Sequence, residues 1–294
     1  MLADWVEKMR VHRTGRVTVP TMFGEAAVYA MPAADGSLVR MLNVGGVLQS
    51  ATYLDERWAE CPFAYLRSFD HLFEAVPALP VKRVLMIGGA GFAYPKSLLV
   101  NHPGVKLDVV EVDGAMVDVA REYFFLDRLE AQLAAEGRDD DLRIFVEDGE
   151  TFLRRSGEGA PAAAGADMAT APEDSAPRAT EAPVPRAAGF PAYEVIINDA
   201  FVGREAVPFF ASDEGIAAAK KRLAPDGLLM ANCVVEYTGD AMYRLFSQVE
   251  RLRDQFANVY VIDASDEEFG GADNYLLIAT DGAYPFTDAI PYDD

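Results

Sequence analysis

The chain has 294 residues, which is enough for one large α/β domain and a smaller attached unit. Its 47 acidic and 26 basic side chains give a formal net charge of −21, so nucleic acid, with its negative phosphate backbone, is not an expected partner. No apolar run is long enough to predict a membrane span, and the N-terminus lacks the layout of a secretory signal. The two cysteines lie far apart and fit buried free thiols in a protein of the reducing cytoplasm.

The segment 1–75 predicts a small β unit followed by a helix. Its start, up to about residue 20, predicts a polar helix or arm. Residues 24–53 alternate apolar and polar side chains and are divided by two glycine-containing turns, a pattern typical of β-hairpins. Residues 55–75 carry large apolar and aromatic side chains at helical spacing, so we expect a helix whose aromatic side chains belong to the core.

From residue 76 to 294 the pattern predicts a second domain, a doubly wound, Rossmann-like α/β sheet of seven strands. The expected strands cover residues 84–87, 109–112, 142–146, 193–198, 228–235, 259–263 and 275–280. One helix is expected after the glycine turn that follows the first strand, and another begins at about 149. Two further helices are expected at 115–125 and 209–223. Residues 156–191 are rich in Ala and Pro with few large apolar side chains, which predicts a disordered surface insertion without a catalytic role.

Three glycines, Gly88, Gly89 and Gly91, follow the first of these strands at once. Glycine lets a backbone turn sharply and approach a ligand closely, and the helix that follows presents free N–H groups. Glu111 lies at the end of the next strand, where a carboxylate can accept hydrogen bonds from two ribose hydroxyls. These features indicate an adenosine-containing ligand. A βαβ turn without a ligand is the alternative, because Tyr94 replaces the third glycine of the strict dinucleotide pattern.

Further carboxylates follow the strands of the same sheet. Asp113 comes just after the second strand, Asp148 and Gly149 follow the third, and Asp199 follows the fourth. The carboxyl ends of these strands form the edge where open α/β sheets bind their ligands. Asp148 could accept a hydrogen bond from an adenine amino group, with a helix N-cap as the alternative. Asp113, Asp148 and Gly149 therefore join the candidate ligand-binding residues.

The motifs VLMIGGAG, VVEVD, VEDGETFL, YEVIINDAF and LAPDGLLMANCV occur in an order that resembles the spermidine synthase family of aminopropyltransferases, in its spermidine-synthase-like bacterial branch. That family belongs to the folds that bind S-adenosylmethionine. The resemblance runs from about residue 45 to the C-terminus, apart from the insertion. It implies that Glu111 binds ribose, that Asp148 reads adenine and that Asp199 is the catalytic base. Gln49 matches a glutamine that lies near the nucleoside.

The resemblance implies attack by a polyamine nitrogen on the propyl carbon beside the sulfonium of decarboxylated S-adenosylmethionine, with methylthioadenosine leaving. An aliphatic ammonium has a pKa of about 10 and must lose a proton before it attacks, and a carboxylate can accept that proton. The implied partners are a small-molecule amine and a second copy of the chain in a homodimer. No metal is expected, because the three histidines are scattered. Glu236, just past the fifth strand, could line the acceptor pocket.

The sequence also departs from the family. The glycine loop, AGFA at 90–93, lacks the aspartate that holds the propylamine end, and Val202 replaces a second aspartate three residues after Asp199. The Tyr-His-Glu signature is missing around 62–65. These departures leave alternatives open: methyl transfer from S-adenosylmethionine, whose own carboxylate a loop acid would repel, or a catalytically silent nucleoside-binding protein. A nicotinamide dehydrogenase is a weaker possibility.

Overall fold

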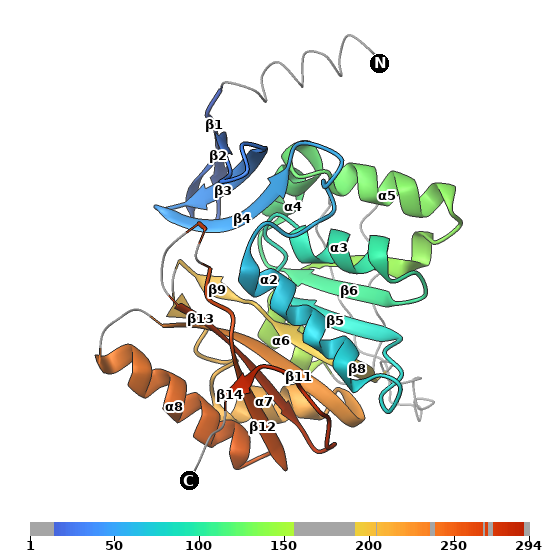
Figure 1. The fold of residues 1–294 in the computed structure, drawn as a ribbon, viewed down its shortest axis with the longest axis vertical. Helices are drawn as coiled ribbons and strands as arrows, with labels where there is room; N and C mark the ends of the chain where they lie inside the picture. Colours follow the sequence, from blue (N-terminus) through green and yellow to red (C-terminus); the bar gives the residue numbers. More distant parts are fainter. Residues whose placement is uncertain are drawn as a thin grey trace, which may run out of the picture.

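The structure, a computed structural model, describes residues 15–155, 192–203, 205–235, 239–266, 268–269 and 273–290. The chain folds into a four-stranded antiparallel sheet and an eight-stranded mixed sheet, with a two-stranded hairpin beside them (Figure 1). The expected insertion at 156–191 and the segment 1–14 lie outside the described residues. None of the helices in the described ranges is both long enough and apolar enough to cross a membrane.

The N-terminal sheet contains the hairpins that the sequence predicts, with one further strand. Its strands pair in the order β1 (Val17–Thr21), β2 (Gly24–Pro32), β3 (Leu38–Val44) and β4 (Val47–Tyr53). The prediction of a helix or arm up to about residue 20 is wrong for β1, because alternate side chains of Val17–Thr21 are partly buried, as in a strand with one covered face. β1 pairs antiparallel with β2 through a tight turn at residues 22–23.

The predicted helix at 55–75 is shorter than expected and has two parts, the α-helix α2 (Ala64–Ser68) and the 3₁₀-helix η1 (Phe69–Ala75). Residues 55–60 form turns and bends instead. The Arg57 backbone N–H donates to the Asp55 carboxylate at 2.9 Å, and such a local bond competes with helix formation. The aromatic side chains of this segment are buried or half-buried, as predicted for core residues.

The large sheet confirms all seven predicted strands and adds an eighth. Its order is β14-β12-β13-β11-β8-β5-β6-β7. The strands are β5 (Arg83–Ile87), β6 (Lys106–Glu111), β7 (Leu142–Val146), β8 (Tyr193–Asn198), β11 (Leu223–Val235), β12 (Asn258–Asp263), β13 (Asp273–Thr280) and β14 (Ala289–Ile290). The short β14 pairs with β12 at the edge, and β13 is antiparallel to both of its neighbours. The chain order reverses between β5 and β8, and the carboxyl ends of those strands bound a crevice of the kind where ligands bind.

Helices cover both faces of the large sheet (Figure 1). They are α3 (Ala93–Asn101), α4 (Gly114–Tyr123), α5 (Leu126–Ala135), the 3₁₀-helix η2 (Asp139–Asp141), α6 (Gly149–Arg154), α7 (Asp213–Lys220) and α8 (Gly239–Arg253). Side chains of α3, α4 and α5 belong to one hydrophobic cluster, and those of α6, α7 and α8 to another. The helix predicted at 209–223 starts only at Asp213, because the Ser212 hydroxyl caps it by accepting the Gly215 N–H at 3.1 Å.

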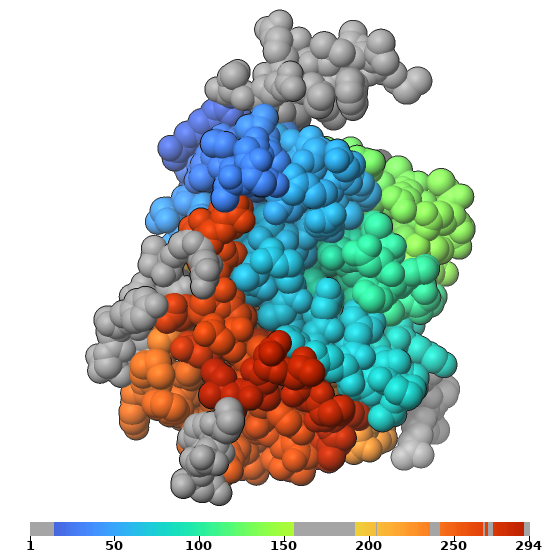
Figure 2. All heavy atoms as spheres, in the orientation of Figure 1, coloured from blue at the N-terminus to red at the C-terminus, as the bar shows by residue number. Residues whose placement is uncertain are grey.

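The N-terminal sheet is packed against the rest of the chain. Met41 of β3 and Leu98 of α3 belong to the same buried hydrophobic cluster. The segment before β13 also reaches this sheet (Figure 2). There the Glu268 carboxylate accepts the Ala34 N–H at 2.8 Å. The N-terminal sheet can therefore place its own side chains at the carboxyl edge of the large sheet. The division of the chain at residues 75 and 76 stays a prediction.

Candidate functional site

Two cavities meet at the carboxyl edge of the large sheet. We call the first the rim cavity; it has a volume of about 310 Å³ and is lined by residues that include Gly88, Glu111, Asp148 and Gly149. We call the second the aromatic cavity; it has a volume of about 380 Å³ and is lined by residues that include Phe63, Tyr65, Asn232, Asp266 and Phe269. The lining residues common to both cavities are Gln49, Ala90, Asp199, Phe201 and Gly203. The structure thus brings most of the predicted site residues to one place.

The glycine loop packs directly against the backbone of Asp199. Gly88 has a φ of +94°, and a Cβ atom there would lie 2.4 Å from the Asp199 carbonyl oxygen. Gly91 is equally confined, since a Cβ atom would lie 2.6 Å from the Ser50 Oγ of β4. Glycine at both positions lets three segments, from β5, β8 and β4, approach one another. With Ser50 in this place, position 91 of the loop has no room for a side chain.

Glu111 at the end of β6 holds this loop in place. Its carboxylate is 7% exposed and accepts hydrogen bonds from the N–H groups of Gly89, at 2.9 Å, and Ala90, at 3.0 Å. Its other oxygen accepts the Asp113 N–H at 3.0 Å. Ala90 has a φ of 42°, in the left-handed region, so these bonds stabilise a turn that a non-glycine residue adopts at a cost. Glu111 therefore joins the loop to the rim cavity, which it also lines.

Asp113 caps a helix and also binds the N-terminal sheet. One carboxylate oxygen accepts the Ala115 N–H at 2.9 Å, which makes Asp113 the N-cap of α4. The other accepts the Met22 N–H at 2.6 Å, from the turn between β1 and β2. Met22 itself lines the rim cavity. Asp113 thus positions a wall of that cavity, and both of its oxygens already accept backbone hydrogen bonds.

Asp148 has the N-cap geometry that the sequence left as an alternative. Its Oδ1 accepts both the backbone N–H of Thr151, at 2.8 Å, and the Thr151 hydroxyl, at 2.9 Å, at the start of α6. Asp148 and Gly149 also line the rim cavity. A Cβ atom at Gly149 would lie 2.8 Å from the Phe210 ring, so this glycine lets Phe210 close one side of the cavity. Asp148 therefore both caps α6 and lines the rim cavity.

Asp199 lies where the two cavities meet, just after β8. Its backbone N–H donates to the Ile87 carbonyl at 2.9 Å, which fixes it beside the glycine loop. Its Oδ1 accepts a hydrogen bond of 3.0 Å from the Asn232 amide. Burial raises the pKa of the Asp199 carboxyl to about 7, although the Asn232 hydrogen bond acts in the opposite direction. A carboxyl group with this pKa can both accept and release a proton near neutral pH.

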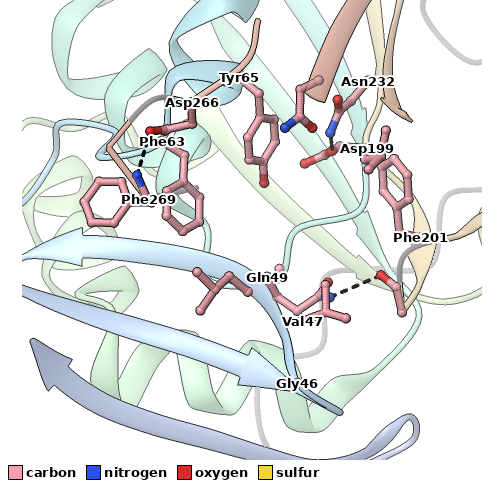
Figure 3. A pocket seen from close by; sticks show the side chains of 15 residues that line it. Gly46, Val47, Gln49, Phe63, Tyr65, Asp199, Phe201, Asn232, Asp266 and Phe269 are labelled. Atoms are coloured by element: carbon pink, nitrogen blue, oxygen red, sulfur yellow. Dashed lines mark hydrogen bonds between the residues drawn. The ribbon is translucent and has the colours of Figure 1, made fainter. Parts of the chain in front are cut away.

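Gln49 of β4 also lies where the two cavities meet, and lines both of them. Its Nε2 donates to the Gly203 carbonyl at 3.4 Å, across the opening between the N-terminal sheet and the hairpin of β9 (Phe201–Val202) and β10 (Glu205–Ala206) (Figure 3). This long hydrogen bond links two elements that the sequence separates by 154 positions. Gln49 lines both cavities, and its place near a ligand stays a prediction.

Aromatic rings that the sequence assigns to the core, or to no role, line the aromatic cavity. The rings of Phe63 and Phe269 meet edge to face at 5.3 Å, and Phe63 stacks on Tyr65 at 6.0 Å. Tyr65 extends into the cavity between Phe63 and Asp199 (Figure 3). Burial, with the nearby Asp199 charge, raises the pKa of the Tyr65 phenol well above its ordinary value, so the hydroxyl stays protonated. The one signal for Asn232 in the sequence is faint, a polar residue inside the apolar run of β11.

The remaining sequence predictions for the site concern metals, cysteines and Glu236. Within the described ranges, no group of three or more His, Cys, Asp or Glu side chains could hold a metal ion. Cys61 and Cys233 are both buried and free, as expected. Glu236 lies outside the described residues.

This architecture defines a class of fold, the S-adenosylmethionine-dependent methyltransferase type, extended by an N-terminal antiparallel sheet. A probable spermidine synthase from Corynebacterium glutamicum superposes with a TM-score of 0.63 at 18% identity, covering 91% of this chain and 81% of its own. A spermidine synthase in complex with the transition state analogue AdoDATO superposes with a TM-score of 0.61 at 17% identity, covering 94% and 75%. The predicted fold is confirmed.

Shorter sequence matches are to proteins that are named for reactions of polyamines. A polyamine aminopropyltransferase of Agathobacter rectalis is 39% identical over 75 residues, 25% of this chain and 24% of the relative. Spermidine synthase 2 of Arabidopsis thaliana is 31% identical over 120 residues, 41% and 31% of the two chains. Putrescine N-methyltransferase 2 of Nicotiana attenuata is 34% identical over 74 residues, 25% and 18%. No protein-family model matches. These matches span less than a third of each relative, so they are partial likenesses to the proteins named.

Proposed function

We propose that the chain is a spermidine synthase-like transferase that moves an aminopropyl group from decarboxylated S-adenosylmethionine to an amine, with Asp199 as the base. The observation that carries this proposal is the place of Asp199, which lines both cavities. A reaction between two substrates needs two binding sites that meet at the reacting atoms. The relatives named polyamine aminopropyltransferase and spermidine synthase support the choice of reaction.

In this proposal the rim cavity takes the nucleoside part of the donor. Glu111 would accept the ribose hydroxyls, and Asp148 the adenine amino group. A carboxylate has about four lone-pair positions, and Glu111 already accepts three backbone hydrogen bonds, from Gly89, Ala90 and Asp113, so the ribose hydroxyls would use the remaining position or replace one of these bonds. Gly88 allows the ligand to approach the backbone closely. The similarity to a synthase that binds AdoDATO supports this placement.

The proposed chemistry moves one proton and one aminopropyl group. The bound ammonium gives a proton to Asp199, and the nitrogen lone pair then attacks the donor carbon beside the sulfonium. A C–N bond forms while the C–S bond breaks, its electron pair stays on sulfur, and methylthioadenosine leaves as a neutral thioether. An ammonium has a pKa of about 10, so transfer to a carboxyl with a pKa of about 7 is uphill by about 4 kcal/mol, about half the cost of transfer to an ordinary aspartate.

Methyl transfer from S-adenosylmethionine itself is the second candidate, and the geometry of Gly91 favours it. A Cβ atom at Gly91 would collide with Ser50, so this position of the loop cannot carry a carboxylate that holds a propylamine group. The carboxylate of S-adenosylmethionine would then not be repelled by a negative charge on this loop. The match to putrescine N-methyltransferases supports the same candidate.

Mass spectrometry of reaction products separates these candidates. The protein is incubated with diamines and either decarboxylated S-adenosylmethionine or S-adenosylmethionine. We expect an aminopropylated amine and methylthioadenosine with the first donor, and loss of this activity in Asp199→Asn. The exposed Asp118→Asn variant serves as the matched control and should stay active. A methylated product would favour the second candidate, and no product from either donor would favour a silent homologue.

A homodimer in the cytoplasm is part of the same proposal. It follows from the resemblance and from the cysteine content. Light scattering on the purified protein tests the dimer, for which we expect twice the 32.0 kDa mass of one chain. A particle with the mass of a single chain would contradict it.

A further inference from the structure

We infer that the aromatic cavity binds a monoamine with an apolar body as the acceptor, in preference to a diamine or a polyamine. The ammonium end of this acceptor would lie beside Asp199, and its apolar body would lie along the aromatic wall. This inference rests on the proposed function, because it names the acceptor class of that reaction. Diamines would then be weak acceptors.

The carboxylates among the described residues that line this cavity are Asp199 and Asp266. Asp266 already accepts three backbone hydrogen bonds, at 2.7 to 3.0 Å, from the N–H groups of Ala64, Glu268 and Phe269, the last of them drawn in Figure 3. These bonds use three of its roughly four lone-pair positions and join the start of α2 to the segment before β13. Asp199 accepts one side-chain hydrogen bond from a described residue, so it has the greater capacity to bind an ammonium.

The wall formed by β11 is apolar at the distance where a diamine would need a second partner. Asn232 and Val234 both line the cavity, since alternate residues of a strand face the same side. Asn232 donates to the Asp199 carboxylate at 3.0 Å. Two residues of a strand span about 7 Å, which is close to the separation of the two nitrogen atoms in 1,4-diaminobutane. Val234 therefore takes a position from which a carboxylate could pair with the far ammonium of a diamine bound at Asp199.

Aromatic and aliphatic side chains form much of the remaining wall (Figure 3). The Phe63 ring contacts the rings of Phe269, at 5.3 Å, and Tyr65, at 6.0 Å, and the side chains of Val47 and Leu48 also line the cavity. Such a wall gains free energy when it covers CH₂ groups or a ring. It offers a second ammonium no charged partner, and a charge buried without a partner is costly. The wall therefore favours an acceptor with one charged end.

Calorimetry with two amines of equal length tests this inference. Pentylamine carries a methyl group where 1,4-diaminobutane carries its second ammonium, and each is titrated at pH 8 into protein saturated with methylthioadenosine. At this pH the Asp199 carboxyl, with its pKa of about 7, is ionised. Salt at about 0.15 M screens the net charge of −21, which would otherwise attract the dication more strongly. We expect pentylamine to bind at least about tenfold more tightly.

The length of the monoamine provides a second measurement on the wild-type protein. From propylamine to pentylamine, each further CH₂ group should raise the affinity about two- to fourfold, because it is covered by the apolar wall. This series and the comparison with 1,4-diaminobutane need no variant, so they decide the inference even where a substitution unfolds the chain.

A substitution at the half-buried Val234 tests the position of the missing partner. Val234→Asp should bind 1,4-diaminobutane at least about tenfold more tightly than wild type does, because the new carboxylate faces the far ammonium. Val234→Asn has the same shape without the charge, so it is the matched control and should not gain affinity for the diamine. Binding of methylthioadenosine should stay unchanged in both variants, which reports an intact fold and rim cavity.

The outcomes separate this inference from the proposed function. If the wild-type protein binds 1,4-diaminobutane as tightly as pentylamine or more tightly, the cavity pairs with a second ammonium and the inference is wrong, although amine transfer can stand. Affinities that do not rise with chain length, or a folded Val234→Asp variant without a gain for the diamine, would also overturn it. If no amine binds, both the inference and the amine acceptor of the proposed function are wrong. A preference for pentylamine that Val234→Asp reverses and Val234→Asn does not supports the inference.

Discussion

The Asp199→Asn variant should be more stable than the wild-type protein at alkaline pH. The folded protein holds the Asp199 carboxyl at a pKa of about 7, whereas its ordinary value, taken for the unfolded chain, is 3.8. A raised carboxyl pKa contributes stability that is fully present below about pH 4 and is lost as the pH rises to about 7. The loss has an upper limit of about 4 kcal/mol, since each tenfold change corresponds to about 1.4 kcal/mol. Asparagine keeps the shape and the Asn232 contact and carries no charge.

The measurable quantity is the change in free energy of unfolding between pH 5 and pH 8. Because Asp199 lines two cavities that water can enter, screening reduces the effect, and we expect the variant to gain about 1–3 kcal/mol relative to wild type over this interval. Urea denaturation of both proteins and of the exposed control Asp118→Asn provides the comparison. A stability difference that stays constant from pH 5 to pH 8 would show that Asp199 is not held protonated by its surroundings.

Three further substitutions test the structure around the site. Gly88→Ala, whose Cβ would lie 2.4 Å from the Asp199 carbonyl, should lower the free energy of unfolding in urea by at least about 3 kcal/mol, and a cost under about 1 kcal/mol would contradict the close approach. Glu111→Gln should weaken calorimetric binding of methylthioadenosine at least about tenfold, since a charged acceptor for hydroxyl groups is lost; unchanged binding would remove Glu111 from the site. Lys96 is fully buried and donates to three oxygen atoms at 2.8 to 3.0 Å, so Lys96→Met should lower the unfolding free energy by about 2–4 kcal/mol, and a neutral effect would refute this role.

The edge of the large sheet was predictable because each of its chemical groups directly follows an apolar strand. Gly88 follows β5, Glu111 ends β6 and Asp199 follows β8. Once these runs are assigned as parallel strands, their carboxyl ends must meet, and the reversal of chain order between β5 and β8 opens the crevice there. The residues are far apart in the sequence, but the sheet geometry alone brings them together.

The walls of the cavities could not be predicted in this way. Gln49 comes from the N-terminal sheet and Phe269 from the segment before β13, and their positions depend on how separate elements pack. Tyr65 has the same spacing as a core residue, and the sequence does not show that its hydroxyl faces a cavity. Asp113 was predicted from its place beside the strand, yet its bond to Met22 arises only after the N-terminal turn has docked.

The missing loop carboxylate and the presence of Gln49 at both cavities have one physical cause. Gly91 has no side chain, and Ser50 of β4 occupies the space that a Cβ atom would need. Gln49 is the neighbour of Ser50 on that strand, so the approach of β4 to the glycine loop also brings Gln49 to the boundary between the cavities, where it reaches Gly203. A loop with a carboxylate at this position would hold β4 farther away. The approach of β4 therefore occupies the space next to position 91, and Asp199 is the carboxylate among the lining residues that the two cavities share.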